Sequence, residues 1–145
     1  MMPAEITKDE ILVVYPKVAQ TMADALGCEV EQVGLNVSLI EDLVAESIDF
    51  LDIIFRLERT FKVKIARGKI VEDVRGDLPE AEFERKGYVT EVGLQRLKDY
   101  LTEVPPDRFG GPMKVADIPR LFTPETFCKV VVRAQRAQPA ENPSA

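Results

Sequence analysis

The residue in this sequence whose type and setting suggest chemistry is one serine, Ser47, in the run Asp-Leu-Val-Ala-Glu-Ser-Ile-Asp at positions 42–49. A serine that attacks a substrate needs a general base such as histidine, and the chain contains no histidine. We therefore do not expect Ser47 to act as the nucleophile of a hydrolase. Its place before a helical pattern also fits an N-cap, whose hydroxyl accepts a hydrogen bond from the first helical turn.

The residues after Ser47 predict an amphipathic helix that carries two apolar stripes. At about 100° per residue, the first stripe has the spacing of a core-facing surface: Phe50, Ile53, Ile54, Leu57 and Phe61. The second stripe is narrower and consists of Ile48, Leu51 and Phe55. The remaining face carries charges: Asp49, Asp52, Arg56 and Arg59. A surface helix needs only one apolar stripe, so the second stripe predicts a partner, or cover by another part of the chain.

A first helix is predicted upstream. Thr7 and Glu10 have the spacing of a capping box. Apolar residues then recur at helical spacing up to Gly27, a residue type that commonly ends helices: Ile11, Tyr15, Val18, Met22 and Leu26. Pro16 interrupts this pattern, because an interior proline removes a backbone hydrogen bond. Two alternatives stay open: one kinked helix, or a main helix that begins at Pro16.

The serine and the helix together resemble the modification site and second helix of acyl carrier proteins. The residues that carry the resemblance are the run at 42–49 and, further along the helix, Leu57, Glu58 and Phe61. In that family the serine bears a 4′-phosphopantetheine arm through a phosphodiester, and an acyl group rides on its terminal thiol. The resemblance implies an arm on Ser47 and a carrier, not an enzyme, that presents a thioester-linked acyl group to enzymes of fatty-acid, lipid or polyketide-like biosynthesis.

The resemblance also implies roles for the residues around Ser47. Partner recognition is expected from one set: Asp42, Glu46, Ile48, Asp49, Leu51, Asp52 and Phe55. Lining of the core or of a bound acyl chain is expected from another: Leu43, Ile53, Ile54, Leu57 and Phe61. The implied partners are a phosphopantetheinyl transferase, an acyl-loading enzyme, and an acyltransferase or synthase. Three residues depart from the usual family pattern: Val44 replaces glycine, Glu46 replaces aspartate and Ile48 replaces leucine.

The rest of the chain is expected to complete an all-α, acyl-carrier-like four-helix bundle. Residues 27–46 correspond to the family's long loop, and the match resumes at 115–122, before a last helix that starts near Thr123. The predicted organisation is a single carrier domain at 1–137, interrupted by an inserted helical segment at about 66–113, with a flexible tail at 138–145. Within the insertion we expect a helix after Thr90 and a return hinge at 110–112.

The role expected for the insertion depends on the surface against which it packs. Its stripe of Leu94, Leu97 and Leu101 needs an apolar surface. Beside the exit of the second helix it would form a lid over the acyl chain, and over the second stripe it would select partners. We expect it beside the exit of the second helix.

Composition and charge narrow the function classes. The chain has 145 residues and a net charge of −6, and residues 1–61 hold 12 acidic against 4 basic residues. This acidity disfavours nucleic-acid binding and favours basic partner proteins. Cys28 and Cys128 are far apart, with no metal-ligand spacing. No apolar run is long enough to span a membrane, so a cytoplasmic location is expected. We also expect a monomer.

Two other function classes remain as alternatives. A helical adaptor would bind a partner through the second stripe and use Ser47 only as an N-cap. An enzyme would use Glu41, Asp42 and Glu46 as acid and base, although exposed carboxylates on an acidic loop are far commoner than catalytic ones.

Overall fold

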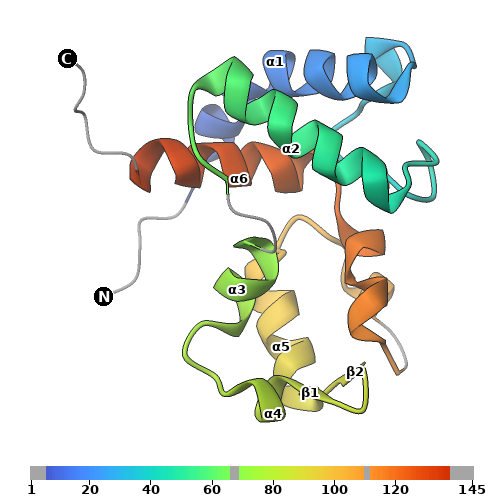
Figure 1. Cartoon of the computed structure of the whole chain (residues 1–145), viewed down its shortest axis with the longest axis vertical. Coiled ribbons are helices and arrows are strands. Elements are labelled where there is room, and N and C mark those ends of the chain that lie inside the picture. Colours follow the sequence, from blue (N-terminus) through green and yellow to red (C-terminus); the bar gives the residue numbers. More distant parts are fainter. Residues whose placement is uncertain (1–5, 66–68, 110–111, 138–145) are drawn as a thin grey trace.

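The computed structural model places a helical bundle against a smaller lobe (Figure 1), and it describes residues 6–65, 69–109 and 112–137. The long helices of the bundle are α1 (Lys8–Leu26), α2 (Ser47–Phe61) and α6 (Pro124–Ala137). The smaller lobe spans residues 69–109. It contains α3 (Lys69–Arg75), α4 (Glu80–Phe83), β1 (Glu84–Arg85), β2 (Tyr88–Val89), α5 (Glu91–Tyr100) and the 3₁₀ helix η2 (Pro106–Phe109). Two more 3₁₀ helices are η1 (Val30–Gln32) and η3 (Val115–Leu121).

Helix α1 begins and ends where its sequence predicts. The Thr7 amide donates to Glu10 Oε1 at 3.0 Å and the Glu10 amide donates to Thr7 Oγ1 at 3.2 Å, which completes a capping box. The helix ends at Gly27, whose φ of 69° suits a residue without a side chain. Between these ends α1 continues through Pro16 without a break. Pro16 lies on the exposed side, so water can reach the carbonyl that the missing N–H leaves unpaired.

The bundle core forms where α1 packs against both α2 and α6. Fully buried side chains from each of these helices meet there: Val18 and Met22 of α1, Ile53 and Leu57 of α2, Phe127 and Val131 of α6. An aromatic cluster closes one end of the core. Phe50 of α2 stacks on Phe127 at a centroid distance of 6.0 Å, and Phe122 meets both rings edge to face. With η3 as the short element, this arrangement confirms the predicted all-α, carrier-like bundle.

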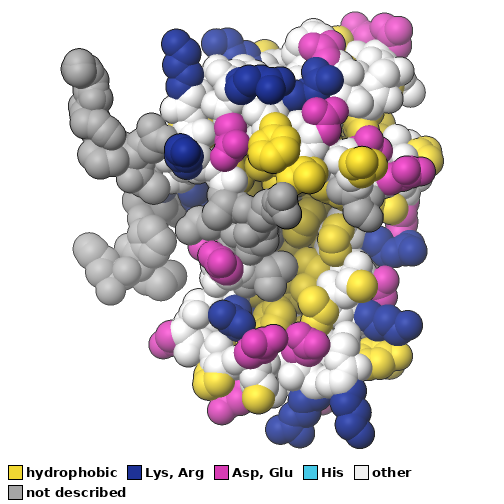
Figure 2. All heavy atoms as spheres, in the orientation of Figure 1, with side chains coloured by type: hydrophobic (Ala, Val, Ile, Leu, Met, Phe, Trp, Pro, Cys, Tyr) yellow, Lys and Arg dark blue, Asp and Glu magenta, His cyan; other side chains and the backbone are white. Residues whose placement is uncertain are grey.

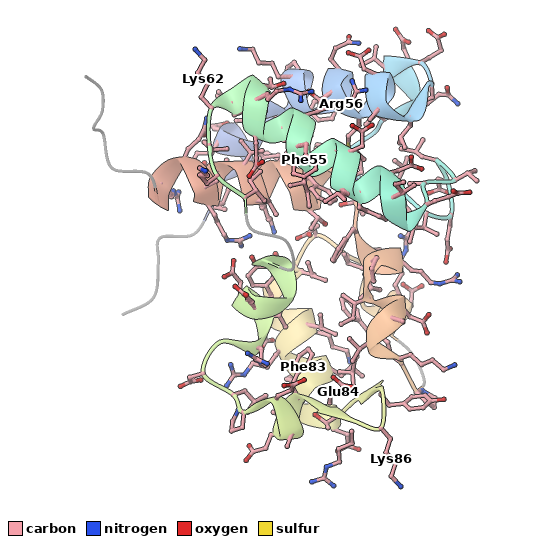
Figure 3. The ribbon with its side chains drawn as sticks, viewed as in Figure 1. Phe55, Arg56, Lys62, Phe83, Glu84 and Lys86 are labelled. Atoms are coloured by element: carbon pink, nitrogen blue, oxygen red, sulfur yellow. The ribbon has the colours of Figure 1, made fainter. Side chains whose placement is uncertain are left out.

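The buried apolar side chains of the lobe belong to one continuous core with those of the bundle, and α5 is the element that the other lobe helices contact. Thr90 caps this helix, because its Oγ1 accepts from the Gly93 amide at 3.0 Å. The predicted helix after Thr90 is therefore present, with Leu97 and Leu101 buried. Gly93 allows close packing, since a Cβ there would lie only 2.7 Å from the Phe83 carbonyl oxygen; Figure 3 labels Phe83 in the lobe.

A short antiparallel hairpin precedes α5, and sequence reasoning did not anticipate it. Strands β1 and β2 pair over two residues each. The turn between them places Lys86 and Gly87 at positive φ, 54° and 84°, which matches the right-handed twist of paired strands.

The lobe is attached to α6 through buried polar groups. Lys129 Nζ of α6 lies 2.7 Å from Glu103 Oε1 and 3.0 Å from Thr102 Oγ1, and Thr126 Oγ1 donates to Glu103 Oε2 at 2.6 Å. The Arg133 guanidinium stacks over the Tyr100 ring at 4.3 Å. As a result α6 lies between the other bundle helices and the lobe (Figure 1).

The lobe's buried ion pair is made with α6, and its buried apolar residues share a core cluster with Val63 and Ile65 at the exit of α2. The expected packing of the insertion beside the exit of the second helix therefore stays a prediction. The predicted hinge at Gly110 and Gly111 and the predicted tail at 138–145 lie outside the described residues.

We expect removal of Glu103 to be strongly destabilising, because it leaves the Lys129 ammonium buried without a counter-ion. The side chains of Lys129 and Glu103 are only 10% and 1% exposed. Glu103→Ala should therefore lower the free energy of unfolding by about 3–5 kcal/mol in urea denaturation. The control is Asp52→Ala, which breaks an exposed pair with Arg56 and should cost less than about 1 kcal/mol. Equal stability of the two variants would contradict the role of the buried pair.

Candidate functional site

The candidate site is the start of α2, where Ser47 is the first helical residue and Glu46 occupies the N-cap position. This corrects the prediction that Ser47 is the N-cap. The helix starts at that point because Asp49 Oδ2 accepts from the Glu46 amide at 2.8 Å, and the Asp49 amide donates to the Glu46 carbonyl at 2.9 Å. The negative charge of Asp49 in the first turn also complements the helix dipole. The side chain of Ser47 lies outside the described part of the structure.

Hydrogen bonds fix the approach loop, residues 35–46, that leads to Ser47. Asp42 Oδ2 accepts from the Ser38 amide at 2.7 Å, and the Asp42 amide donates to the Ser38 carbonyl at 2.9 Å. The amide of the buried Ala45 donates to the Leu39 carbonyl at 2.8 Å. Each of these bonds restrains the backbone just before the serine.

The approach loop is also bound to the end of η3 and the start of α6. The Leu39 amide donates to the Phe122 carbonyl at 3.2 Å, the Glu125 amide donates to the Leu35 carbonyl at 3.2 Å, and Ser38 Oγ donates to the Arg120 carbonyl at 3.3 Å. Segments about eighty residues apart in sequence therefore set the position of Ser47 together.

Sequence reasoning missed Ser38, which is 1% exposed and takes part in both sets of bonds. Its spacing of four residues from Asp42 was the available signal, because serine and aspartate commonly bond nearby backbone groups in turns.

Val44, three residues before Ser47, has an unusual backbone conformation. Its φ is 59°, in the left-handed region that β-branched residues strongly disfavour. Its side chain is 75% exposed, so contacts with the core do not explain the valine. Glycine, the usual residue of the resembled family at this position, adopts positive φ without a side-chain penalty. Val44 therefore differs from the usual family pattern in residue type and also places a β-branched residue at a positive φ, where glycine carries no penalty.

The two stripes of α2 have different environments. In the first stripe Ile53 and Leu57 are fully buried, and Ile54 and Phe61 are partly buried against the core, as is Leu43 of the approach loop. In the second stripe Ile48 is 71% exposed and Phe55 48% exposed, while Leu51 is half-buried. The lobe therefore leaves Ile48 and Phe55 accessible. Figure 2 shows hydrophobic side chains on this side of the molecule among acidic and basic ones.

Charges of opposite sign lie at the two ends of α2. Its start carries Glu46 and Asp49, and its last turn carries Arg59. Between them, Arg56 Nε lies 3.0 Å from Asp52 Oδ1, the i,i+4 pair that the spacing suggests. Figure 3 shows Phe55 and Arg56 midway along the helix and Lys62 at its far end. The face that surrounds the second stripe is therefore acidic near Ser47 and basic away from it.

A cleft of about 450 Å³ lies beside the approach loop. Residues of the approach loop, of η2, of η3 and of the segment just before η3 line it: Glu41, Arg108, Pro112, Met113, Asp117, Arg120 and Leu121. Within it the Arg120 guanidinium lies 3.7 Å from both Glu41 and Asp117. Two cationic and two anionic side chains line the cleft, so it carries no excess of one sign of charge.

Two of the carboxylates that could serve in acid–base catalysis have structural partners, because Glu41 pairs with Arg120 and Asp42 bonds the Ser38 amide. Glu46 contributes its backbone amide to the start of α2. Among the described residues, no cluster of three or more potential ligands could hold a metal ion.

The two cysteines are free thiols that differ in environment. Burial is the main reason that the pKa of the Cys128 thiol rises to about 12. Cys128 therefore stays protonated and unreactive at neutral pH.

Comparisons with known proteins agree with this geometry. A family model described as the phosphopantetheine attachment site matches residues 16–74. An acyl carrier protein of Bdellovibrio bacteriovorus is 30% identical over 81 residues, which are 52% of this chain and 97% of the relative. An acyl carrier protein of Clostridium acetobutylicum is 35% identical over 52 residues, 36% of this chain and 68% of the relative.

A third relative is the acyl carrier protein AcpXL of Mesorhizobium japonicum. It is 32% identical over 60 residues, 41% of this chain, and the chain spans 64% of its length. No solved structure matches. Within the described ranges, none of the helices has the length and apolarity needed to cross a membrane.

The burial of the two stripes predicts different costs for truncating them. Ile53→Ala removes a fully buried side chain and should lower the free energy of unfolding by about 2–5 kcal/mol. Phe55→Ala removes a side chain that is about half exposed and should cost roughly 1 kcal/mol or less. Thermal and urea denaturation would compare the two variants. A Phe55 variant as unstable as the Ile53 variant would place the second stripe in the core.

Proposed function

Because this chain belongs to the acyl carrier protein family, whose members are carriers and not catalysts, we propose that it holds an acyl group as a thioester on a 4′-phosphopantetheine arm attached to Ser47. The observation that carries the proposal is the environment of the serines within the matched segment. Residues 16–74 match the phosphopantetheine attachment site and contain only two serines, Ser38 and Ser47. Ser38 is 1% exposed and hydrogen-bonded inside the approach loop, which leaves Ser47 at the start of α2.

The cofactor of this family, 4′-phosphopantetheine, is a flexible arm that ends in a thiol. The protein must hold the serine where a modifying enzyme can reach it. The hydrogen bonds of Asp42 and Ala45 support this role, because they order the backbone before Ser47. In the proposed mechanism the chain positions the arm and supplies no catalytic group.

The proposal assigns separate roles to the two stripes of α2. The buried and half-buried side chains of Leu43, Ile53, Ile54, Leu57 and Phe61 line the core and would shelter the proximal part of a bound acyl chain. The second stripe would contact partner enzymes, together with the acids around it: Asp42, Glu46, Asp49 and Asp52. The exposure of Ile48 and Phe55 supports this division.

The proposed partners are a phosphopantetheinyl transferase, an acyl-loading enzyme, and an acyltransferase or synthase of fatty-acid, lipid or polyketide-like biosynthesis. We propose that the carrier acts as a monomer in the cytoplasm. The free thiols of Cys28 and Cys128 fit a reducing compartment.

We expect Ser47→Ala to abolish attachment of the arm while the fold remains intact. Ser47 begins α2 without being its N-cap, and alanine is a better helix former than serine, so stability should change by less than about 1 kcal/mol. Intact-mass spectrometry after incubation with coenzyme A and a phosphopantetheinyl transferase would detect the arm. The control Ser144→Ala changes a serine outside the matched segment and should be modified like the wild type.

Attachment that persists in the Ser47 variant would show that another residue carries the arm. A wild-type chain that stays unmodified would favour the helical adaptor, which uses the second stripe without an arm.

We expect Phe55→Ala to weaken acyl loading of the arm-bearing protein without weakening its fold. The loss should appear as a higher KM for the loading enzyme, because the second stripe provides contacts to the enzyme and not to the reacting atoms. Val13→Ala, which truncates a 78% exposed side chain on α1, is the control. Unchanged loading of the Phe55 variant would remove the second stripe from the docking surface.

A further inference from the structure

Val44 combines two properties that rarely occur together in a folded protein. It is a β-branched residue at a φ of 59°, and its side chain is 75% exposed. Positive φ brings the Cβ of an L-residue close to its own backbone, and two branches at that atom worsen the contact. Burial can compensate for such strain, but little of the Val44 side chain is buried. The fold therefore gains little from valine at this position.

The surrounding backbone holds Val44 in this conformation. On one side the Leu43 amide donates to the Ser38 carbonyl at 3.2 Å, and on the other the Ala45 amide donates to the Leu39 carbonyl at 2.8 Å. Ala45 is buried, at 5% exposure. These bonds determine the direction of the chain on both sides of Val44, and with it the direction of the Cα–Cβ bond of Val44. Strained residues that their surroundings hold in place cluster at functional sites.

The position of Val44 limits what it can contact. Ser47 is three residues later, and Ile48, which is 71% exposed, follows the serine directly. An enzyme that attaches the arm must bring its active site to Ser47. Its surface must therefore cover the residues immediately before and after the serine. Val44 and Ile48 are the large exposed apolar side chains there, and both lie within reach of any enzyme docked on Ser47.

We propose that Val44, together with Ile48, determines which phosphopantetheinyl transferase modifies this carrier. This inference rests on the proposed function of Ser47 and names a feature of the partner. The two exposed apolar side chains flank the serine in sequence, so the fitting transferase would have an apolar rim around its active site. A transferase that closes tightly against a glycine at position 44 would meet the isopropyl group of Val44 instead. Val44 thus favours one class of modifying enzyme and excludes another.

Three substitutions at position 44 separate recognition from backbone effects. Val44→Asn relieves strain, because asparagine tolerates positive φ, and it replaces an apolar surface with a polar one. Val44→Gly relieves strain and removes the side chain, but it loosens the loop. Val44→Ala keeps the non-glycine backbone restriction and removes the two methyl groups. The melting temperatures of the Asn and Gly variants should be at or above that of the wild type, so all can be compared as folded proteins.

The experiment measures arm attachment by a transferase that modifies the wild-type chain, with coenzyme A as donor and intact mass as readout. We expect all three variants to show roughly a tenfold higher KM for the carrier with kcat unchanged, the factor expected when most of the burial of one valine side chain is lost. Val44→Ala combined with Ile48→Ala should be less than additive, because the two side chains share one surface. Val13→Ala, on the first half of α1 and far from the start of α2 (Figure 1), should leave KM unchanged.

The possible results distinguish this inference from the proposed function. If KM is raised only in the Gly variant and equals the wild-type value in the Asn variant, the stiffness of the loop determines KM. That result would overturn the proposed recognition of an apolar side chain at position 44. Wild-type KM in all three variants would also overturn it, while arm attachment to Ser47 would stand. A wild-type chain that no transferase modifies would overturn the proposed function and this inference together.

Discussion

The burial of α6 on two sides is the constraint on which the rest of this structure depends. From Leu121 to Val132 every side chain is buried, including the charged Glu125 and Lys129. One side of α6 packs on α1, as a bundle helix should. The other side presents Lys129, whose charge is costly to bury without a counter-ion. Glu103 of the lobe provides that counter-ion. The ion pair joins the bundle to the lobe, and removing either residue would leave the charge of the other one buried without a partner.

The same constraint reaches the candidate site through the start of α6. The approach loop bonds the carbonyls of Arg120 and Phe122 and receives the Glu125 amide, so its geometry depends on how α6 is held. The lobe holds α6 from the side away from α1, and Ile48 and Phe55 of the second stripe remain exposed. An inserted segment thereby stabilises the carrier without covering the surface that surrounds Ser47. Removing residues 66–113 would expose the Lys129 side of α6 as well as shorten the chain.

The sequence predicted the elements that depend on residues close together in the chain. The capping box of Thr7, the Thr90 cap and the two stripes of α2 depend on spacings within about one helical turn, and the structure has each of them. The resemblance at 42–49 identified the family and its cofactor for the same reason. Two local predictions failed or stayed open. Ser47 was assigned the N-cap, which belongs to Glu46 because Asp49 bonds the Glu46 amide. The continuity of α1 through Pro16 could not be predicted, since packing decides it.

Contacts between distant segments could not be predicted in the same way. The partnership of Lys129 with Glu103 spans 26 residues and that of Ser38 with Arg120 spans 82, and no periodic pattern marks either one. For that reason the attachment of the lobe to α6 was not predicted. The hairpin was missed because its strands are two residues long, too short for an alternating pattern to show.

The charged residues of α2 can be explained by the stability of the helix alone. Acids at the start of the helix and a base in its last turn complement the helix dipole, and the Asp52–Arg56 pair stabilises the helix locally. These residues would be favourable in a helix with no partner at all, so their charge alone does not indicate docking. Exposed apolar side chains have no such explanation, because water disfavours them. Ile48 and Phe55, and the strained Val44 that precedes Ser47, are therefore the residues from which a binding surface on this carrier is best inferred.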